Sequence, residues 1–372
     1  MVEEFSFDVS KEIMEKILER KKEMGFLKKS WDDWFNFLLG NKSEEKSTQK
    51  IIEEVCSKNN YQAYYNNWIK NFSINLEHIW NEHSARELSI NTDNKKASAI
   101  VIGRGPSIIK KNHLKMLSES GYEGNIVCTD GSLATVLEAG ITPDKFKNFF
   151  VVTIDSQDHQ KRFYEHDSVF QYGDKIKCIL STTASPLTYK IIKEAHMERY
   201  WLHTLVDFDK GNSSFNYISD TMVKSKKHER GLPAIQTGGN VGTSAWIISW
   251  SLLKCDTVCL VGFDMGYPVD IDLEKDNFNK NFLINYRNLK FPEGINENDE
   301  AFKKAYPIIT NPEFNCKCRQ DPTFQYYCNA LKEFIFKTSK KIYTVNATEG
   351  GALFGEGIKC MKFMDFLQEY HK

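Results

Sequence analysis

Two patterns of hydrophobic positions divide the chain. Up to about residue 84, apolar residues recur at helical spacing, and Ser10 and Ser30 are placed to cap the first two helices. A third helix is predicted from aromatic and aliphatic positions that share one face. These positions are Tyr61, Tyr64, Tyr65, Trp68, Ile69 and Phe72. The stripe either packs on its own neighbours and the following domain or forms a homo-oligomer or partner surface.

From Ser98 the pattern changes to short β-branched runs that alternate with helical segments, which is typical of a parallel α/β sheet. The polar stretch from Ser84 to Ala97 marks the boundary. We therefore predict a helical segment over 1–95 and an α/β domain over 96–372. The expected strands are Ser98–Ile102, Ile126–Thr129, Phe149–Ile154, Cys178–Ser181, Tyr200–Thr204, Thr257–Val261 and Ile342–Val345.

Two long segments interrupt this alternation. Asp207–Gly231 ends in a basic run with Lys224, Lys226, Lys227 and Arg230, and an Asn- and aromatic-rich insertion covers about 268–320. Long loops in compact domains are commonly lids or insertions near a site. The basic run is therefore either a lid over the site or a solvated loop.

Composition excludes several classes of function. With 49 Lys+Arg against 50 Asp+Glu, the net charge of -1 gives no global field to recruit nucleic acid or an anionic membrane. No apolar run approaches the roughly 18 residues of a spanning helix, and the acidic start lacks the form of a signal peptide. Nine scattered cysteines suit a reducing compartment. We expect a cytoplasmic protein that holds any anionic ligand in a local site.

The first candidate site follows the first strand of the α/β domain. Gly103, Arg104, Gly105, Pro106 and Ser107 form a Gly-x-Gly-Pro-Ser turn into a helix. The glycines allow close backbone approach, and a helix start offers unpaired amides to an anion. The turn lacks the third glycine of a dinucleotide loop and the Gly-Lys-Ser/Thr of a P-loop, so it indicates either phosphate binding or a plain tight turn.

Polar residues also follow other strands. Asp130, Gly131 and Ser132 suit a ribose or base contact, or equally a helix cap, because open parallel sheets bind ligands beyond the carboxyl ends of their strands. Asp155 ends the next strand and is a candidate for holding a metal-bound water or a ligand hydroxyl. Thr182 belongs to a hydroxyl cluster at a further strand end.

The most specific pattern is a glycine-rich loop before an apolar helix. Gly238, Gly239, Asn240, Gly242 and Thr243 form a loop whose backbone can wrap a ligand at the positive end of that helix. Asp264 lies just past the following strand, so we expect it to face the same crevice.

These motifs together resemble the MptE-like family of archaeal 6-hydroxymethylpterin diphosphokinases, over about residues 98–360. The resemblance rests on the ordered set Gly103–Ser107, Asp130–Gly131, Thr237–Gly242, Val261–Gly266 and Asn346–Gly351. It implies a Rossmann-like, mostly parallel sheet, similar to bacterial sialyltransferases, and a nucleotide-using transferase. The pterin enzymes use ATP and magnesium, whereas the related motility-associated factors (Maf) transfer nonulosonic acids.

Two mechanisms follow from this resemblance. With ATP as donor and a pterin acceptor, backbone amides cradle the phosphates and Asp155 or Asp264 holds Mg²⁺. With a CMP-sugar donor, a general base must activate an acceptor hydroxyl, and His203 and His159 are the candidates. A third alternative is a nucleotide-binding protein without turnover. The helical segment and the insertion favour the glycosyltransferase, and the activity that names the family favours diphosphoryl transfer.

Overall fold

The computed structural model describes residues 48–89, 97–207, 211–269, 303 and 306–370, with the side chains of 48–62 left aside. The chain divides into two compact units, Met1–Ile51 and Ile52–Lys372, and the description below concerns the second. The helices predicted after Ser10 and Ser30 lie outside the described residues. So does 270–302 of the predicted insertion.

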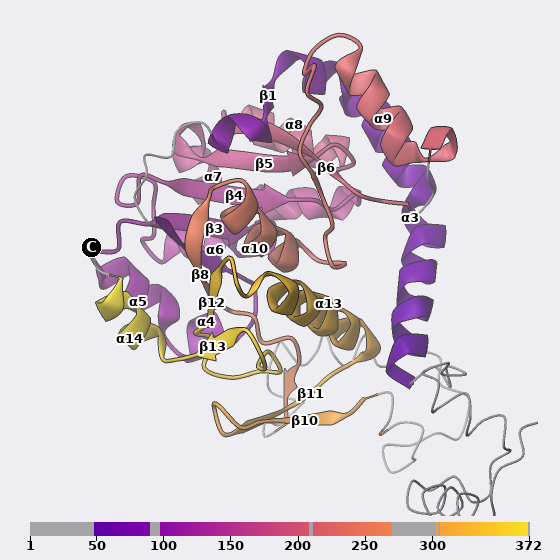
Figure 1. Cartoon of the computed structure of the whole chain (residues 1–372). Helices are drawn as coiled ribbons and strands as arrows, with labels where there is room; N and C mark the ends of the chain where they lie inside the picture. The colour runs from indigo at the N-terminus through magenta and orange to yellow at the C-terminus, as the bar shows by residue number, and fades with distance from the viewer. Residues whose placement is uncertain (1–47, 90–96, 208–210, 270–302, 304–305, 371–372) are drawn as a thin grey trace, which may run out of the picture. The chain divides into compact units, whose positions relative to one another are not determined.

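A ten-stranded sheet forms the centre of this unit, and every strand pair in it is parallel (Figure 1). The strand order is β1-β6-β5-β4-β3-β2-β8-β12-β13, with β7 beside β6. The bounds are β1 His83–Ser84, β2 Ala97–Ile102, β3 Asn125–Thr129, β4 Phe149–Thr153, β5 Lys177–Ser181, β6 Glu198–Thr204, β7 Ala234–Ile235, β8 Cys255–Val261, β12 Tyr343–Asn346 and β13 Ile358–Cys360. All seven predicted strands are confirmed, and the sheet is Rossmann-like.

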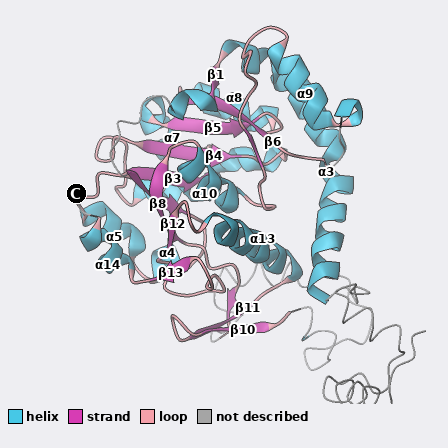
Figure 2. Ribbon diagram, in the orientation of Figure 1, coloured by secondary structure: helices cyan, strands magenta, loops and turns pink. Residues whose placement is uncertain are grey.

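Helices cover both faces of the sheet, so the unit has three layers (Figure 2). One face carries α3 Thr48–Asn81, α4 Ser107–Lys110, α5 His113–Glu119, α6 Leu133–Glu138, α7 Asp167–Tyr172, α8 Pro186–Glu194, α9 Phe215–Lys224 and α14 Phe363–Glu369. The other face carries α10 Val241–Ser251 and α13 Pro322–Thr338. Burial on both faces explains the nearly continuous apolar strands. Among the described residues, no helix has the length and apolarity to cross a membrane.

The third predicted helix is α3, and it packs on the α/β core. Phe72 and Tyr65 form edge-to-face ring contacts with Phe215 of α9, at centroid distances of 5.4 and 6.3 Å. Asn71 and Asn75 are buried and donate from their amides to carbonyls just past β4 and β5, at 2.9–3.1 Å. For these positions, the prediction that the stripe packs on the following domain is confirmed.

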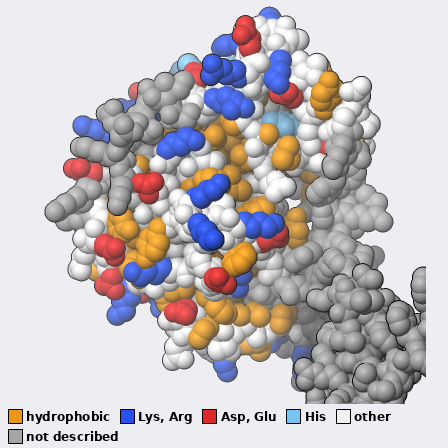
Figure 3. Space-filling view, in the orientation of Figure 1, with side chains coloured by type: hydrophobic (Ala, Val, Ile, Leu, Met, Phe, Trp, Pro, Cys, Tyr) orange, Lys and Arg blue, Asp and Glu red, His pale blue; other side chains and the backbone are white. Residues whose placement is uncertain are grey.

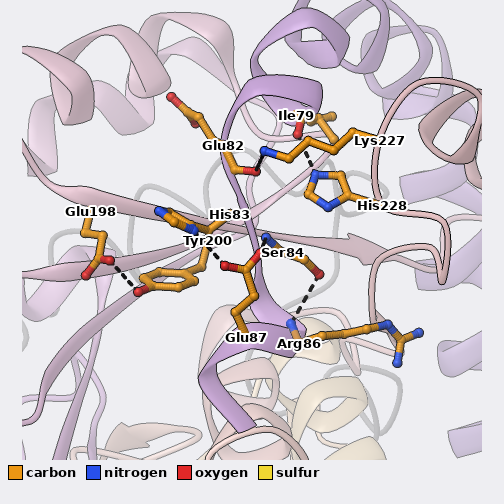
Figure 4. Close-up of polar contacts among 10 residues, drawn as sticks. All are labelled: Ile79, Glu82, His83, Ser84, Arg86, Glu87, Glu198, Tyr200, Lys227 and His228. Carbon is orange, nitrogen blue, oxygen red and sulfur yellow. Dashed lines mark hydrogen bonds and ion pairs between the residues drawn. The ribbon is translucent and has the colours of Figure 1, made fainter. Parts of the chain in front are cut away.

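The segment Asp207–Gly231 is not the irregular loop predicted, because it contains helix α9. Its basic run lies at the end of α3. Lys227 donates to the Glu82 carbonyl at 3.1 Å, and His228 lies 2.7 Å from the Ile79 carbonyl (Figure 4). Lys226 lies 5.0 Å from the Trp80 ring centre. Helix carboxyl ends attract cations and leave carbonyls unpaired, so the run caps α3 and is no lid.

Part of the predicted insertion forms a small antiparallel sheet. Strands β10 Ile308–Asn311 and β11 Cys316–Arg319 make a hairpin that pairs with β9 Tyr267–Pro268. On the face seen in Figure 3, Lys and Arg side chains are scattered with acidic ones among them, in keeping with the near-zero net charge.

Candidate functional site

A cleft of about 1040 Å³ opens beyond the carboxyl ends of β2, β3, β4 and β8. The strands run outward in sequence from β2 to β6, and β8 then returns to the other side of β2. In open α/β sheets, ligands bind at such a reversal of strand order. The cleft is lined by eleven of the predicted residues: Gly103, Arg104, Gly105, Asp130, Gly131, Asp155, Gly238, Gly239, Asn240, Gly242 and Asp264.

The loop after β2 is packed against the loop after β8. Gly103 N donates to the Val261 carbonyl and Gly105 N to the Gly262 carbonyl, both at 2.9 Å. A Cβ on Gly105 would lie 1.9 Å from Oδ2 of Asp264. The glycines therefore allow two strand-end loops to touch, and the amides of Gly103 and Gly105 are not free to cradle a phosphate.

Asp264 occupies the start of α4. The Ser107 hydroxyl donates to its Oδ2 at 2.7 Å, and the helix that follows is only four residues long. Burial raises the pKa of Asp264 to about 6, although the hydrogen bonds from Ser107 oppose the rise. The side chain still reaches the cleft. It is therefore a carboxylate that changes protonation near neutral pH, as a general base requires.

A second carboxyl group with a raised pKa lies after β3. Asp130 is buried and accepts hydrogen bonds from Gly131 N at 2.7 Å and from the Thr153 hydroxyl at 3.0 Å. Burial, and secondarily the charge of Asp155, raises its pKa to about 6. Asp155 itself lines the cleft and accepts from Gln157 N at 2.9 Å and Gln160 Nε2 at 2.6 Å.

Two arginines that share one aromatic ring bring positive charge to the cleft. The guanidinium carbons of Arg104 and Arg162 lie 4.8 and 4.9 Å from the centre of the Phe163 ring. Partial burial, and then the neighbouring Arg162, lowers the pKa of Arg104. Arginine side chains in general keep their positive charge in folded proteins. Arg162 and Phe163 were missed because they lie in a short polar 3₁₀ helix, Asp158–Phe163, with no periodic signal.

The glycine-rich loop begins α10 as predicted, and Asn240 caps it by accepting from Thr243 N at 2.9 Å. Gly238 and Gly239 have φ of 58° and 84°, which favour glycine. A Cβ on Gly239 would lie 2.6 Å from the rings of both Tyr326 and Tyr327. The loop is thus packed beneath α13, whose aromatic side chains line the same cleft and gave no motif in the sequence.

Six predicted site residues lie outside the cleft lining. These are Pro106, Ser107, Ser132, Thr182, Thr243 and His203. Ser132 and Thr182 are buried, with Ser132 donating to the Ile102 carbonyl at 2.8 Å.

His203 lies beside the cleft, where Nδ1 is 2.7 Å from the Thr182 hydroxyl and Nε2 is 3.0 Å from Asn216 Oδ1. Burial lowers the pKa of His203. Because both ring nitrogens have partners and neither lines the cleft, this placement disfavours His203 as the predicted base. His159 is exposed and lies outside the lining.

The described residues contain no group of three or more His, Cys, Asp or Glu side chains that could hold a metal ion. The two predicted ligands, Asp155 and Asp264, both accept hydrogen bonds from protein groups. Mg²⁺ commonly takes only one or two carboxylates, together with substrate phosphates and water. Asp155, at the cleft surface, fits that pattern better than Asp264 beneath Gly105.

Two comparisons with known proteins found matches. A family model described as "6-hydroxymethylpterin diphosphokinase MptE-like" matches residues 70–270. Among solved structures, the Maf glycosyltransferase from Magnetospirillum magneticum AMB-1 is similar at 13% identity and a TM-score of 0.48. That match covers 80% of this chain and 41% of the bacterial protein. No curated protein matches the chain.

Proposed function

This chain belongs to the MptE-like family, and from that premise we propose that it is a transferase whose cleft binds a phosphate-bearing nucleotide donor. The observation that carries the proposal is the pair of guanidiniums, Arg104 and Arg162, at the point where the strand order reverses. Arginine binds phosphate oxygens in a bidentate manner, and each such contact is charge-assisted. The two guanidiniums thus bring positive charge to a cleft that also holds carboxylates, at the place where a donor would lie.

The reaction we propose first is diphosphoryl transfer from ATP to 6-hydroxymethyl-7,8-dihydropterin. The acceptor hydroxyl oxygen would form a bond to the β-phosphorus, and the bond from that phosphorus to the oxygen of the α-phosphate would break, releasing AMP. Asp264 or Asp130 would take the hydroxyl proton, since a pKa of about 6 leaves each mostly ionised above neutral pH. Arg104 and Arg162 would neutralise charge on the transferred group.

Magnesium stays a prediction. If it binds, Asp155 would hold it together with donor phosphate oxygens, and it would supply further charge neutralisation.

A second candidate is glycosyl transfer from a CMP-activated nonulosonic acid. At about 1040 Å³ the cleft has room for a sugar beside a nucleotide, as it has for a pterin beside ATP. In this reaction the same carboxylates would activate the acceptor hydroxyl.

The test is a side-by-side assay of the full-length protein. AMP release from ATP with the hydroxymethylpterin is compared with CMP release from CMP-nonulosonic acids, each with and without Mg²⁺. Turnover in one arm alone identifies the donor. If neither ATP with Mg²⁺ nor CMP shifts the melting temperature, the proposed donor site is wrong.

A further inference from the structure

Two pairs of aromatic side chains line the cleft from helices α3 and α13, which are not the segments that carry Arg104 and Arg162. Tyr64 and Trp68 of α3 have ring centroids 6.5 Å apart, and Tyr326 and Tyr327 of α13 have centroids 5.8 Å apart. All four side chains line the cleft and are partly exposed (Figure 1 shows the two helices). Aromatic rings at such a surface offer flat apolar faces to a ligand.

The wall formed by α13 is firmly positioned. Asp321 caps the helix by accepting from Phe324 N at 2.7 Å, and Leu331 and Ile335 are fully buried on the sheet side. Tyr326, Ala330 and Phe334 are spaced four residues apart and so share one face of α13, next to the buried face of Leu331 and Ile335. All three line the cleft. Glycine at 238 and 239 lets this face approach the loop closely. The rings therefore meet a ligand with little freedom to move.

The wall formed by α3 is held in a different way. Trp68 precedes Asn71 and Asn75 by one and two helical turns, and those two side chains fasten α3 to the loops after β4 and β5. Trp68 also meets the Tyr65 ring edge-on at 6.4 Å. The position of Trp68 is thus coupled to the loop that carries Asp155.

The two ends of the cleft come from different parts of the chain. Four charged residues of the cleft, Arg104, Asp130, Arg162 and Asp264, lie within 70–270, the part that the family model matches. Both aromatic pairs lie outside it. The donor end of the cleft therefore lies within the matched region, and the aromatic end lies outside it.

We propose that Tyr64, Trp68, Tyr326 and Tyr327 form the acceptor subsite, and that it stacks on a ring with a flat apolar face and a hydrogen-bonding edge. A reduced pterin and a sugar both have this chemistry. The inference rests on the proposed transferase function and adds that residues outside the family region select the acceptor. Glu333 and Lys337, exposed on α13, also line the cleft and offer charged groups on the same helix as the two tyrosines.

The experiment uses full-length Trp68→Leu and Tyr326→Leu, each beside its conservative partner, Trp68→Phe or Tyr326→Phe. Phe336→Leu is the matched control, because Phe336 is 54% exposed on α13 and does not line the cleft. Acceptor KM is measured with the pterin and with sugar acceptors in separate arms, and donor Kd is measured by calorimetry with ATP and with CMP.

Each leucine variant should raise the acceptor KM about 10-fold, since stacking on one ring contributes roughly that much. Donor Kd should stay within about 2-fold, the phenylalanine variants should recover most of the loss, and Phe336→Leu should behave as wild type. The arm that responds identifies the acceptor class.

Unchanged acceptor KM in both leucine variants, or an equal loss of donor affinity, would overturn the inference. So would a wild-type protein that binds donor but neither type of acceptor, in which case the donor site still stands. A wild-type protein that binds no donor would instead refute the proposed function on which the subsite rests.

Discussion

Replacing Asp130 by asparagine tests whether the ionised Asp130 side chain, buried beside the cleft, destabilises the folded protein. Asp130 is 5% exposed, and burial raises its pKa from 3.8 to about 6 despite hydrogen bonds from Gly131 and Thr153. The pKa of Asp130 is higher in the folded state than in the unfolded state, so the protonated side chain adds to the free energy of unfolding, in full below about pH 4. This stabilising contribution is lost as pH rises through about 6.

The magnitude follows from the two pKa values. A difference of about two units corresponds to roughly 3 kcal/mol in the free energy of unfolding, and about half of it is lost between about pH 5 and about pH 8. The asparagine variant has no proton to lose at this position. Relative to wild type, its free energy of unfolding should therefore rise by about 1.5 kcal/mol over that interval. Any fixed cost of exchanging the two hydrogen bonds cancels in this difference.

The assay is urea unfolding followed by tryptophan fluorescence at both pH values, with Asp130→Asn and wild type in parallel. Asp256→Asn is the control for losing one negative charge, because Asp256 is exposed on strand β8 of the same sheet. If the free energy of unfolding of Asp130→Asn minus that of wild type stays constant or falls as pH rises, the raised pKa is refuted. Loss of turnover in the same variant would show that the destabilising carboxylate serves the reaction.

Four further substitutions test the charge and packing of the cleft and the anchoring of α3. Arg104→Gln and Arg162→Gln should each weaken ATP binding about 10-fold or more in calorimetry, whereas the exposed Arg230→Gln should not. Gly239→Ala should lower the free energy of unfolding by about 2 kcal/mol more than its control Gly140→Ala. The two glycines have similar φ angles of 84° and 81°, but only a Cβ at Gly239 would have aromatic rings within 4 Å. Equal losses in the two variants would mean that backbone strain alone is the cause. Asn75→Ala should lower the free energy of unfolding in urea by about 2–4 kcal/mol, because it removes two buried hydrogen bonds. Asn81→Ala is the control and should cost under about 1 kcal/mol, because the Asn81 side chain bonds within α3. Similar losses in the two variants would contradict the anchoring of α3.

The sequence predicted the sheet well because parallel strands buried on both faces give continuous β-branched runs. It did not predict β1, β7 or β13, whose two or three residues are too few to show a period. Helix α9 was missed because its buried Phe215 and Val223 alternate with polar residues in a segment whose basic end resembles a loop. The hairpin of β10 and β11 was missed for the same reason of polar composition.

At the site, the sequence located the cleft but not the partners of its loops. Aspartates and glycines after β2, β3, β4 and β8 must share one edge, since parallel strands end together. Whether a glycine faces a ligand or another segment depends on contacts far apart in the chain, such as Gly239 with Tyr326. The aromatic stripe of α3 showed helical spacing, but spacing could not reveal that Trp68 reaches the cleft while Phe72 is buried.

The amide clamp of α3 also has a consequence for how the chain is made. Asn75 and the Thr182 carbonyl it binds are separated by 107 residues. A ribosome adds about 5–20 residues per second, so roughly 5 to 20 s pass between the synthesis of the helix and that of its binding partner. During this interval the Phe215 ring, on which Tyr65 and Phe72 of α3 pack, has not yet been made. Translation speed, and not only equilibrium stability, therefore bears on the yield of folded protein.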